Sequence, residues 1–543
     1  VMALTERLVL TPSVVDTDGE GEVAGLLEAH LREHAADLPH VEIVGVDVDK
    51  PTRCRAVMAF CPANVSDGGA AGKSGAGSAK GNPTAAGTKK TLLLMGHLDT
   101  VGLEPYKSYS DIAYDSAKLK EVFAGNTDEH IAAHAQSPDW NFGRGWLDMK
   151  GGVAAITEVF LHEARRGELP ANLVLLLTPD EESASRGLRT LVPELTRLKD
   201  EHALEFVRVV NADYISPLFI GDDRKYFYSG VVGKLLLGLS VFGEPTHAGE
   251  TFDGVNSSTL AGYLAYALEH NRRLMCGTGG EWLPPPTVLH MGDRRTRYDV
   301  MTMDYGQVYV NMFHLGEEPR ELWRRIVGEV RRVVNRFDRE MRLRYNRFSA
   351  KANLRLPRYE LKPEVIDYAG LLDRVYAAHG NAAAQAELIQ AEALKLHADD
   401  RERALFVIRR LHGLLPPGRP VVVVSLLPPF YPAQLSPKAG PATDAMKQFC
   451  SDHALSHRWV YPYISDMSYF SFGDVKLLEQ WHAQSPLWFA AGEVERYSAI
   501  AAPVCNLGPW GIGAHTAEER VYVPFLRDEL PRLLSEALYR FAG

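Results

Sequence analysis

Three short segments of the chain concentrate the residues whose types and spacing could do chemistry. They lie at residues 96–99, 143–150 and 179–182, and together they contain one histidine, three aspartates and two glutamates. Imidazole nitrogens and carboxylate oxygens are the ligands that hold metal ions in hydrolases. The three segments therefore predict an enzyme with a metal site.

His97 and Asp99 stand two residues apart at the end of a predicted strand, so their side chains leave the same face. This spacing suits a metal-bound histidine and a carboxylate that hydrogen bonds to its second ring nitrogen. A turn at the end of the strand would explain the pair about as well.

Asp148 directly precedes a predicted helix, where a helix cap is the simpler explanation. Gly151 and Gly152 follow it, and two glycines weaken a helix start unless the backbone must approach another group closely. A carboxylate at Asp148 that bridges two metal ions would be such a reason.

Asp180, Glu181 and Glu182 are successive acids at the end of an apolar strand. Neighbouring buried carboxylates repel one another unless a cation is present, so a bound metal is the economical explanation. In extended backbone, neighbouring side chains point to opposite sides. One glutamate could then bind metal while the other faces the reacting centre.

Two further candidates come later: Asp213 ends another apolar strand, and His515 lies in a glycine-rich loop. Each alone is more often a turn residue. Together with the earlier segments, however, they place every candidate ligand at a strand end or in a glycine-rich loop. That is the layout expected for a site at the carboxyl edge of an open sheet.

The elements that must position these residues alternate between strands and helices. Strands are predicted at residues 41–46, 55–60, 91–95 and 172–178, and helices at 3–32, with a break at 11–13, and at 151–166 and 523–541. This order predicts an α/β fold with a mostly parallel, helix-flanked sheet. Residues 63–90, rich in Gly, Ala, Ser and Lys, are predicted to form a flexible surface loop.

From residue 230 the pattern changes to that of a compact α+β sandwich inserted into the first domain. Strands are predicted at 234–242, 287–290, 307–313 and 351–356, and helices at 256–273 and 319–346. Helices at 381–397 and 401–414 and a strand at 421–427 are assigned to the first domain where it resumes. The predicted domains are thus 1–229 with 362–543, and 230–361.

Length and composition limit the class of protein. A chain of 543 residues predicts two or more domains. Its net charge of -10, spread along the chain, disfavours nucleic acid and anionic membranes as partners. The sequence has neither an apolar run of bilayer length nor a signal-peptide pattern, so a cytoplasmic protein is expected. Its five scattered cysteines favour buried free thiols.

The motifs resemble those of the co-catalytic zinc exopeptidases, a family that includes carboxypeptidase G, aminoacylase and succinyl-diaminopimelate desuccinylase. The resemblance implies two zinc ions, the first held by His97, Asp148 and Asp213 and the second by Asp148, Glu182 and His515. Asp148 would then be the bridge between the two ions. Manganese or cobalt would suit the same ligands.

The same resemblance assigns the remaining roles. Glu181 would be the general base, and Asp99 would orient His97. The inserted domain would serve as a lid and for dimerisation, and its His247 would reach the active site of the partner subunit in a homodimer. Without the resemblance, His247 would be taken for a turn residue between a strand and a helix.

The chain is longer than the compact members of this family, with roughly a hundred additional residues before His515, too many for a simple connection. Within them, Ser465 and Asp466 are expected either to line the substrate pocket or to form a buried polar turn. This segment, the approach at 140–145 and the overall length look like the RocB-type arginine-utilisation proteins.

The reaction that the resemblance implies is hydrolysis of an amide bond in a small peptide or an N-acyl amino acid. The two ions would lower the pKa of a water between them, and Glu181 would take its proton. The alternative is a catalytically silent dimer, stabilised by metal, that binds an amino-acid-like ligand. The complete set of ligands and the presence of a base favour the enzyme.

Overall fold

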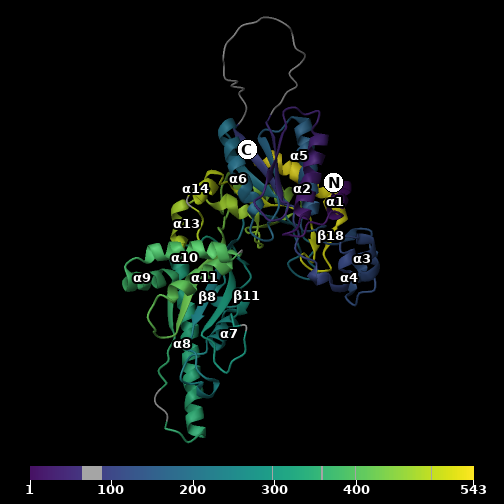
Figure 1. Ribbon diagram of the computed structural model, residues 1–543. Helices are drawn as coiled ribbons and strands as arrows, with labels where there is room; N and C mark the ends of the chain where they lie inside the picture. The colour runs from purple at the N-terminus through teal and green to yellow at the C-terminus, as the bar shows by residue number, and fades with distance from the viewer. Residues whose placement is uncertain (64–88, 296, 356–358, 398, 491, 543) are drawn as a thin grey trace, which may run out of the picture. The chain divides into compact units, whose positions relative to one another are not determined.

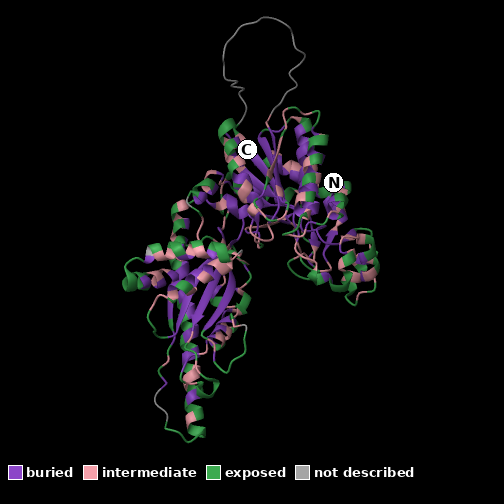
Figure 2. Ribbon diagram, in the orientation of Figure 1, coloured by how far each residue is buried: buried purple, intermediate pink, exposed green. Residues whose placement is uncertain are grey.

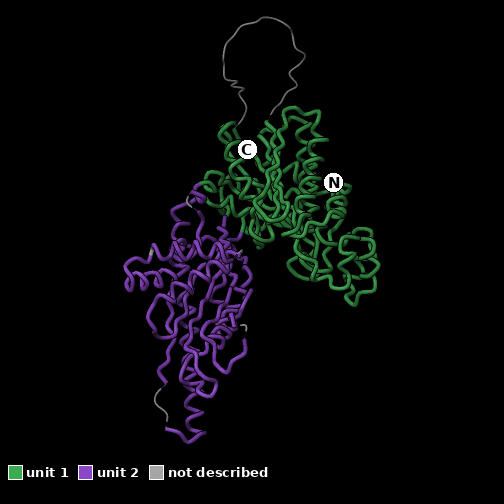
Figure 3. Tube along the Cα trace, in the orientation of Figure 1, with its two compact units in different colours: residues 1–231, 435–473, 496–543 green, residues 232–434, 474–495 purple. Residues whose placement is uncertain are grey.

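The computed structural model describes residues 1–63, 89–295, 297–355, 359–397, 399–490 and 492–542 (Figure 1). The chain forms two compact units (Figure 3). Unit 1 comprises Val1–Val231, Leu435–Gly473 and Arg496–Gly543, and unit 2 comprises Val232–Gln434 and Asp474–Glu495. The flexible loop predicted at 63–90 lies, from residue 64 to 88, outside the described residues.

Unit 1 is built on an eight-stranded sheet in the order β1-β2-β5-β3-β6-β16-β7-β15. Its strands are β1 (Glu42–Asp47), β2 (Arg55–Cys61), β3 (Lys90–His97), β5 (Asn172–Thr178), β6 (Glu205–Asn211), β7 (Tyr226–Tyr228), β15 (Ser456–Arg458) and β16 (Val504–Asn506). The four central strands β5, β3, β6 and β16 are parallel, and β2 joins them antiparallel on one side. The predicted α/β fold with a mostly parallel sheet is confirmed.

The central strands are apolar on both faces because helices cover the sheet from both sides. In Figure 1, α6 (Arg186–His202) lies on one side of these strands, and α2 (Gly19–His34) and α5 (Lys150–Arg166) lie on the other. Figure 2 shows the strands buried and the outer faces of the helices exposed. Helix α5 ends before Gly167, whose φ of 65° is the left-handed conformation that glycine adopts without strain.

The other helices of unit 1 are shorter. They are α1 (Met2–Val9), α3 (Ser116–Phe123), α4 (Glu129–Gln136), α12 (Pro441–Asp452) and α15 (Leu530–Phe541). The helix predicted at 523–541 is divided, because a π-helical turn at Phe525–Glu529 precedes α15. α14 (Glu493–Ala499) crosses the boundary between the two units.

A three-stranded sheet in the order β17-β18-β4 joins distant parts of unit 1. Its strands are β4 (Trp140–Phe142), β17 (Gly511–Ile512) and β18 (Arg520–Tyr522), too short to give a pattern in the sequence. Arg520 pairs with Phe142, and the backbone N–H of Gly143 donates to the carbonyl of Glu519 at 3.0 Å. The loop that carries Asp148 therefore lies beside the loop that carries His515.

Unit 2 is an α+β unit on a five-stranded sheet in the order β11-β12-β8-β14-β13. Its strands are β8 (Gly233–Phe242), β11 (Thr287–Gly292), β12 (Tyr305–His314), β13 (Glu364–Asp367) and β14 (Val421–Tyr431). Its helices are α7 (Ser257–Leu268), α8 (Pro319–Lys351), α9 (Tyr368–His379), α10 (Ala382–Leu396), α11 (Asp400–His412) and α13 (Val475–His482). A short hairpin joins β9 (Gly277–Thr278) to β10 (Glu281–Trp282). No helix among the described residues is long and apolar enough to cross a membrane.

The units differ from the predicted domains at the second boundary. Residues 362–434 were assigned to the resumed first domain, but they belong to unit 2 together with 474–495. The reason is β14, which pairs with β8 on one side and β13 on the other. The strand predicted at 351–356 is also wrong over residues 351–355, because α8 continues to Lys351 and a turn follows it; residue 356 lies outside the described residues.

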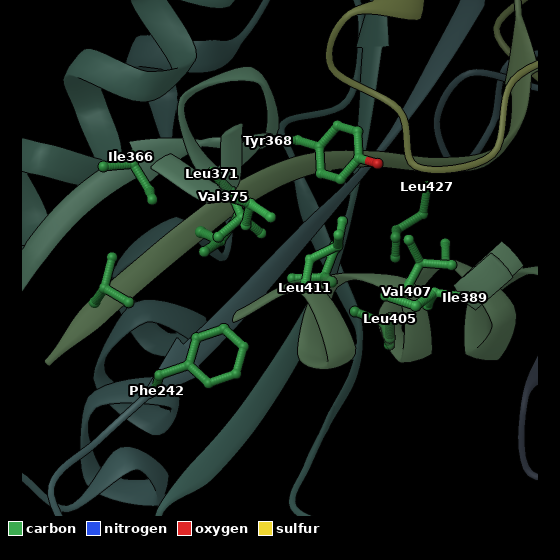
Figure 4. Packing of buried hydrophobic residues seen from close by; sticks show 14 of the residues in the cluster. Phe242, Ile366, Tyr368, Leu371, Val375, Ile389, Leu405, Val407, Leu411 and Leu427 are labelled. Carbon is green, nitrogen blue, oxygen red and sulfur yellow. The ribbon is translucent and has the colours of Figure 1, made fainter. Parts of the chain in front are cut away.

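The core of this extended unit is formed by the added elements themselves. Apolar side chains of α9, α10, α11 and β14 pack with Phe242 of β8 and Tyr305 of β12 in one buried cluster (Figure 4). Leu405 and Leu411 of α11 are fully buried within it. The segment from 362 to 434 thus completes the core of unit 2.

Replacing Leu411 with alanine is expected to lower the free energy of unfolding by about 2–5 kcal/mol, because the truncation leaves a cavity in this cluster. The matched control is Leu388→Ala in α10, where the side chain is 67% exposed. Its effect is expected to stay within about 0.5 kcal/mol. Urea unfolding followed by circular dichroism measures both, and an unchanged midpoint for Leu411→Ala would contradict this packing.

Candidate metal centre

The candidate ligands meet at the carboxyl edge of the large sheet in unit 1. His97 is the last residue of β3, Glu181 and Glu182 follow β5, and Asp213 follows β6. These three strands are parallel neighbours in the order β5-β3-β6, so their carboxyl ends lie side by side. Asp148 and His515 arrive from the loops joined by the three-stranded sheet.

The carboxylate of Asp148 lies between two histidines. Its Oδ1 is 3.0 Å from Nε2 of His97, and its Oδ2 is 3.0 Å from Nε2 of His515. Nε2 of His515 is also 3.1 Å from Oε1 of Glu182. His97, Asp148 and Glu182 each offer a ligand atom within 4.8 Å of the others. The structure therefore brings four of the predicted ligands together.

The contact between His97 and Asp148 fits a metal ion as well as a hydrogen bond. Nδ1 of His97 is 3.0 Å from the backbone oxygen of Asp99, which assigns the proton of a neutral ring to Nδ1. Burial lowers the pKa of His97, but Asp148, Glu181 and Asp99 raise it well above its usual value, so without a cation Nε2 carries a second proton and donates it to Asp148. A metal ion can take the place of that proton. Two ligand atoms that each lie about 2 Å from one ion are about 3 Å apart, as these two are.

Asp148 does not cap the following helix. The N-cap of α5 is Met149, after a cis Asp148–Met149 peptide bond, and the N-terminus of α5 receives no side-chain hydrogen bond at that position. The glycines after it have a reason other than the predicted bridging carboxylate. A Cβ on Gly152 would lie 2.0 Å from the backbone oxygen of Ala212, so glycine lets α5 approach the segment that carries Asp213.

The carboxylate of Asp99 binds the acidic turn at Glu181 and Glu182 rather than the imidazole of His97. Its two carboxylate oxygens accept hydrogen bonds from the backbone N–H groups of Glu181, at 3.1 Å, and Glu182, at 3.0 Å. Oδ1 of Asp99 is 3.8 Å from Nδ1 of His97, beyond hydrogen-bond distance. The predicted orientation of His97 comes instead from the backbone oxygen of Asp99.

The three successive acids do not share one environment. Asp180 is fully buried, and its Oδ1 lies 2.5 Å from Nζ of Lys50, which also pairs with Glu20, and 3.6 Å from Nη1 of Arg186, so protein cations offset its charge. Its Oδ2 accepts a hydrogen bond from the backbone N–H of Arg186 at the start of α6. Residues 181–184 form a turn rather than the extended backbone we expected. Glu181 and Glu182 alone contribute charge to the site.

Negative charge dominates the electrostatics of the centre. Burial raises the pKa of Glu181 well above its usual value, and Glu182, Asp466 and Asp213 raise it further against the effect of His97. Burial, with the charge of Asp148, raises the pKa of Asp213 to about 7. Asp213 lies outside the set of three ligand atoms within 4.8 Å, and its Oδ1 accepts from the backbone N–H of Tyr214 at 2.8 Å. Such an excess of buried carboxylates favours a bound cation.

A buried glutamate that the sequence did not single out supports Asp148. Glu519 accepts hydrogen bonds from the backbone N–H groups of Gly145 at 2.8 Å, Leu147 at 3.2 Å and Asp148 at 3.3 Å. It also pairs with Arg144 at 2.5 Å, and both side chains are at most 1% exposed. In the sequence, only its position four residues after His515 pointed to Glu519, because the residues that it contacts lie some 370 positions earlier.

Ser465 and Asp466 lie behind the acidic turn. They are 2% and 1% exposed. Oγ of Ser465 accepts a hydrogen bond from Nδ2 of Asn211 in β6 at 3.2 Å, and Asp466 accepts from Thr178 in β5 at 3.0 Å. This placement favours the alternative of a buried polar turn over a lining of the substrate pocket.

His247 belongs to unit 2, where it is exposed. Its Nδ1 accepts a hydrogen bond from the backbone N–H of Gly249 at 3.1 Å, so it caps the short 3₁₀ turn Ala248–Glu250. Locally it is the turn residue that its flanking elements predict. Its contribution to the active site of a partner subunit stays a prediction.

Comparisons with known proteins agree with this geometry. The chain is 29% identical to YqjN of Bacillus subtilis over 458 residues, which are 82% of this chain and 83% of YqjN. It is 27% identical to Protein RocB of the same organism over 557 residues, 99% of this chain and 94% of RocB. A tripeptidase from Staphylococcus aureus has the same fold, with a TM-score of 0.52, 13% identity and coverage of 100% of this chain and 97% of that one.

The family assignment comes from a match over most of the chain. The model of "Peptidase family M20/M25/M40" matches residues 93–514, a range that contains His97, Asp148, Glu181, Glu182 and Asp213. The resemblance to the co-catalytic exopeptidases is thereby confirmed. The chain belongs to peptidase family M20/M25/M40 and is a metallopeptidase of that family.

Proposed function

We propose that this metallopeptidase hydrolyses an amide bond in a small peptide or an N-acyl amino acid at a centre of two metal ions. One observation carries the proposal: the two oxygens of Asp148 each lie 3.0 Å from a different histidine, His97 and His515. A carboxylate placed in this way can bridge two ions.

The donor set fits the expected ligands. We assign His97, Asp148 and Asp213 to one ion and Asp148, Glu182 and His515 to the other. Two imidazoles and three carboxylates suit zinc, and manganese or cobalt as well. When bound, such a pair of ions supplies an activated water and polarises the carbonyl of the substrate. Zinc is the ion we expect.

Glu181 is assigned the proton transfer. It follows Asp180, which Lys50 holds in place, and its own backbone N–H is bound by Asp99. Burial raises the pKa of Glu181, and a base with a raised pKa both accepts a proton from water and returns it to the leaving nitrogen.

We also propose that unit 2 serves as a lid and forms a homodimer. β11 is the edge strand of its sheet, and Leu289 and Met291 on that strand are 59% and 51% exposed. An exposed apolar edge strand is a surface that a second copy can cover. His247 would then act in the site of the partner subunit, as the family resemblance implies.

A mass-spectrometric screen of zinc-loaded protein tests the reaction. The panel contains dipeptides, tripeptides and N-acyl amino acids, with arginine derivatives among them because of the similarity to Protein RocB. Hydrolysis of an amide that stops after chelation and returns with metal supports the proposal. Two bound ions without turnover on any member would favour the catalytically silent dimer.

A further inference from the structure

Unit 2 contains a cavity of about 590 Å³. Its wall is formed by the end of β8, the segment before β12, and α11. It carries three arginines and one acid beside apolar side chains: Arg294, Arg295, Arg409, Asp304, Phe242 and Tyr305. This volume lies within the range of sites that hold small molecules.

Two of the arginines already have carboxylate partners. Nη1 of Arg294 lies 2.5 Å from Oε2 of Glu402. Arg295 pairs with Asp299 and donates to the backbone oxygens of Met301, at 2.8 Å, and Thr302, at 3.1 Å. These contacts fix the two side chains at the wall and neutralise them locally.

Arg409 has no such partner. In the part of the chain that the structure describes it forms no ion pair, and its Nε is buried without a hydrogen-bond acceptor. Its guanidinium lies over the ring of Tyr305, 5.4 Å from the centroid. Burial lowers the pKa of Arg409, while Tyr305 and Glu402 raise it against a further lowering by Arg294. A half-buried guanidinium whose Nε has no acceptor is unfavourable unless a ligand supplies one.

We propose that this cavity binds a small organic oxyanion, either a carboxylate or a phosphate ester with an apolar body, through the guanidinium of Arg409. The planar fork of arginine matches both kinds of oxyanion. Phe242, Met303 and Tyr305 offer the apolar surface for the rest of the molecule. None of the residues assigned to the metal centre lines the cavity, although its wall includes Met301, which pairs with His247.

Isothermal titration of the metal-loaded full chain with 3-phenylpropionate and with phenyl phosphate tests the site. We expect Arg409→Met to lower the affinity for the preferred probe by about tenfold or more, because hydrogen bonds to a charged group are lost. The matched control is Arg410→Met, since Arg410 is exposed, pairs with Glu392 at 3.0 Å and does not line the cavity. Binding of a probe to the metal ions would be common to all variants and would not depend on residue 409.

A second variant distinguishes a loss of binding from a loss of folding. Arg409→Lys keeps the positive charge and most of the stem but removes the fork, so its affinity is expected to fall between those of the parent and Arg409→Met. Preference for one probe identifies the carboxylate or the phosphate ester as the ligand class. If neither probe binds, or if both variants bind like the parent protein, the proposal is wrong.

Discussion

Replacing Glu181 with glutamine is expected to lower kcat by about 10²–10⁴-fold while leaving the metal content unchanged. Glutamine keeps the size of the side chain and its backbone contact with Asp99, but it cannot accept a proton from water. The measurement combines kcat on the best substrate of the panel with the metal content by mass spectrometry. Loss of metal together with activity would contradict the role of base.

The neighbouring residue provides the matched control. Oε1 of Glu182 lies 3.1 Å from Nε2 of His515, and Glu182 is one of the three close ligands, whereas Glu181 is not. Glu182→Gln is therefore expected to reduce the metal content as well as the activity. The two adjacent substitutions should separate proton transfer from metal binding.

Replacing Glu519 with glutamine is expected to have the largest effect on stability. The change removes the charge that balances Arg144, whose side chain is 1% exposed. Breaking one partner of a buried ion pair costs about 3–5 kcal/mol. Glu519 also accepts from the backbone N–H of Asp148, and the neutral amide oxygen of glutamine holds that N–H less strongly, so metal affinity is expected to fall by about 10–100-fold, as for other groups that orient metal ligands. Chemical unfolding and metal titration measure the two effects.

Two further variants decide whether Glu519 positions Asp148 or only stabilises the fold. Glu518→Gln is the control, because Glu518 forms no ion pair with any described residue. The double variant Arg144→Met with Glu519→Leu replaces the ion pair by apolar side chains, so no buried charge is left without a partner and part of the lost stability is expected to return. It leaves the N–H groups of the loop without their acceptor, so metal affinity is expected to stay low. Full recovery of metal affinity would assign Glu519 a purely structural role.

The centre of the fold, and the meeting of most candidate ligands at one edge of the sheet, could be predicted from the sequence. β3 and β5 are continuous apolar segments, so their burial on both faces could be predicted without any knowledge of their partners. The candidate ligands lie directly at the ends of such strands or beside glycines. Each of these signals is local, and the parallel order of the strands then brings the side chains to one edge.

What the sequence could not show depends on partners far along the chain. β14 looked like a strand of the resumed first domain, because its apolar residues would fit either sheet, and only pairing with β8 decides between them. The sequence also gave no sign that Asp180 forms an ion pair with Lys50, which lies 130 positions earlier in the chain. The role of Glu519 likewise depends on a distant partner, because it forms an ion pair with Arg144.

The position of β16 has a consequence for how the protein is made. This strand pairs with β6 inside the large sheet, through Val504 and Val209, although 293 residues separate Asn211 from Val504. At a synthesis rate of about 5–20 residues per second, about 15–60 s pass between the synthesis of β6 and that of β16. During that interval β6 is an unpaired apolar edge, the kind of surface to which other nascent chains adhere. We expect the growing chain to depend on chaperones in this interval.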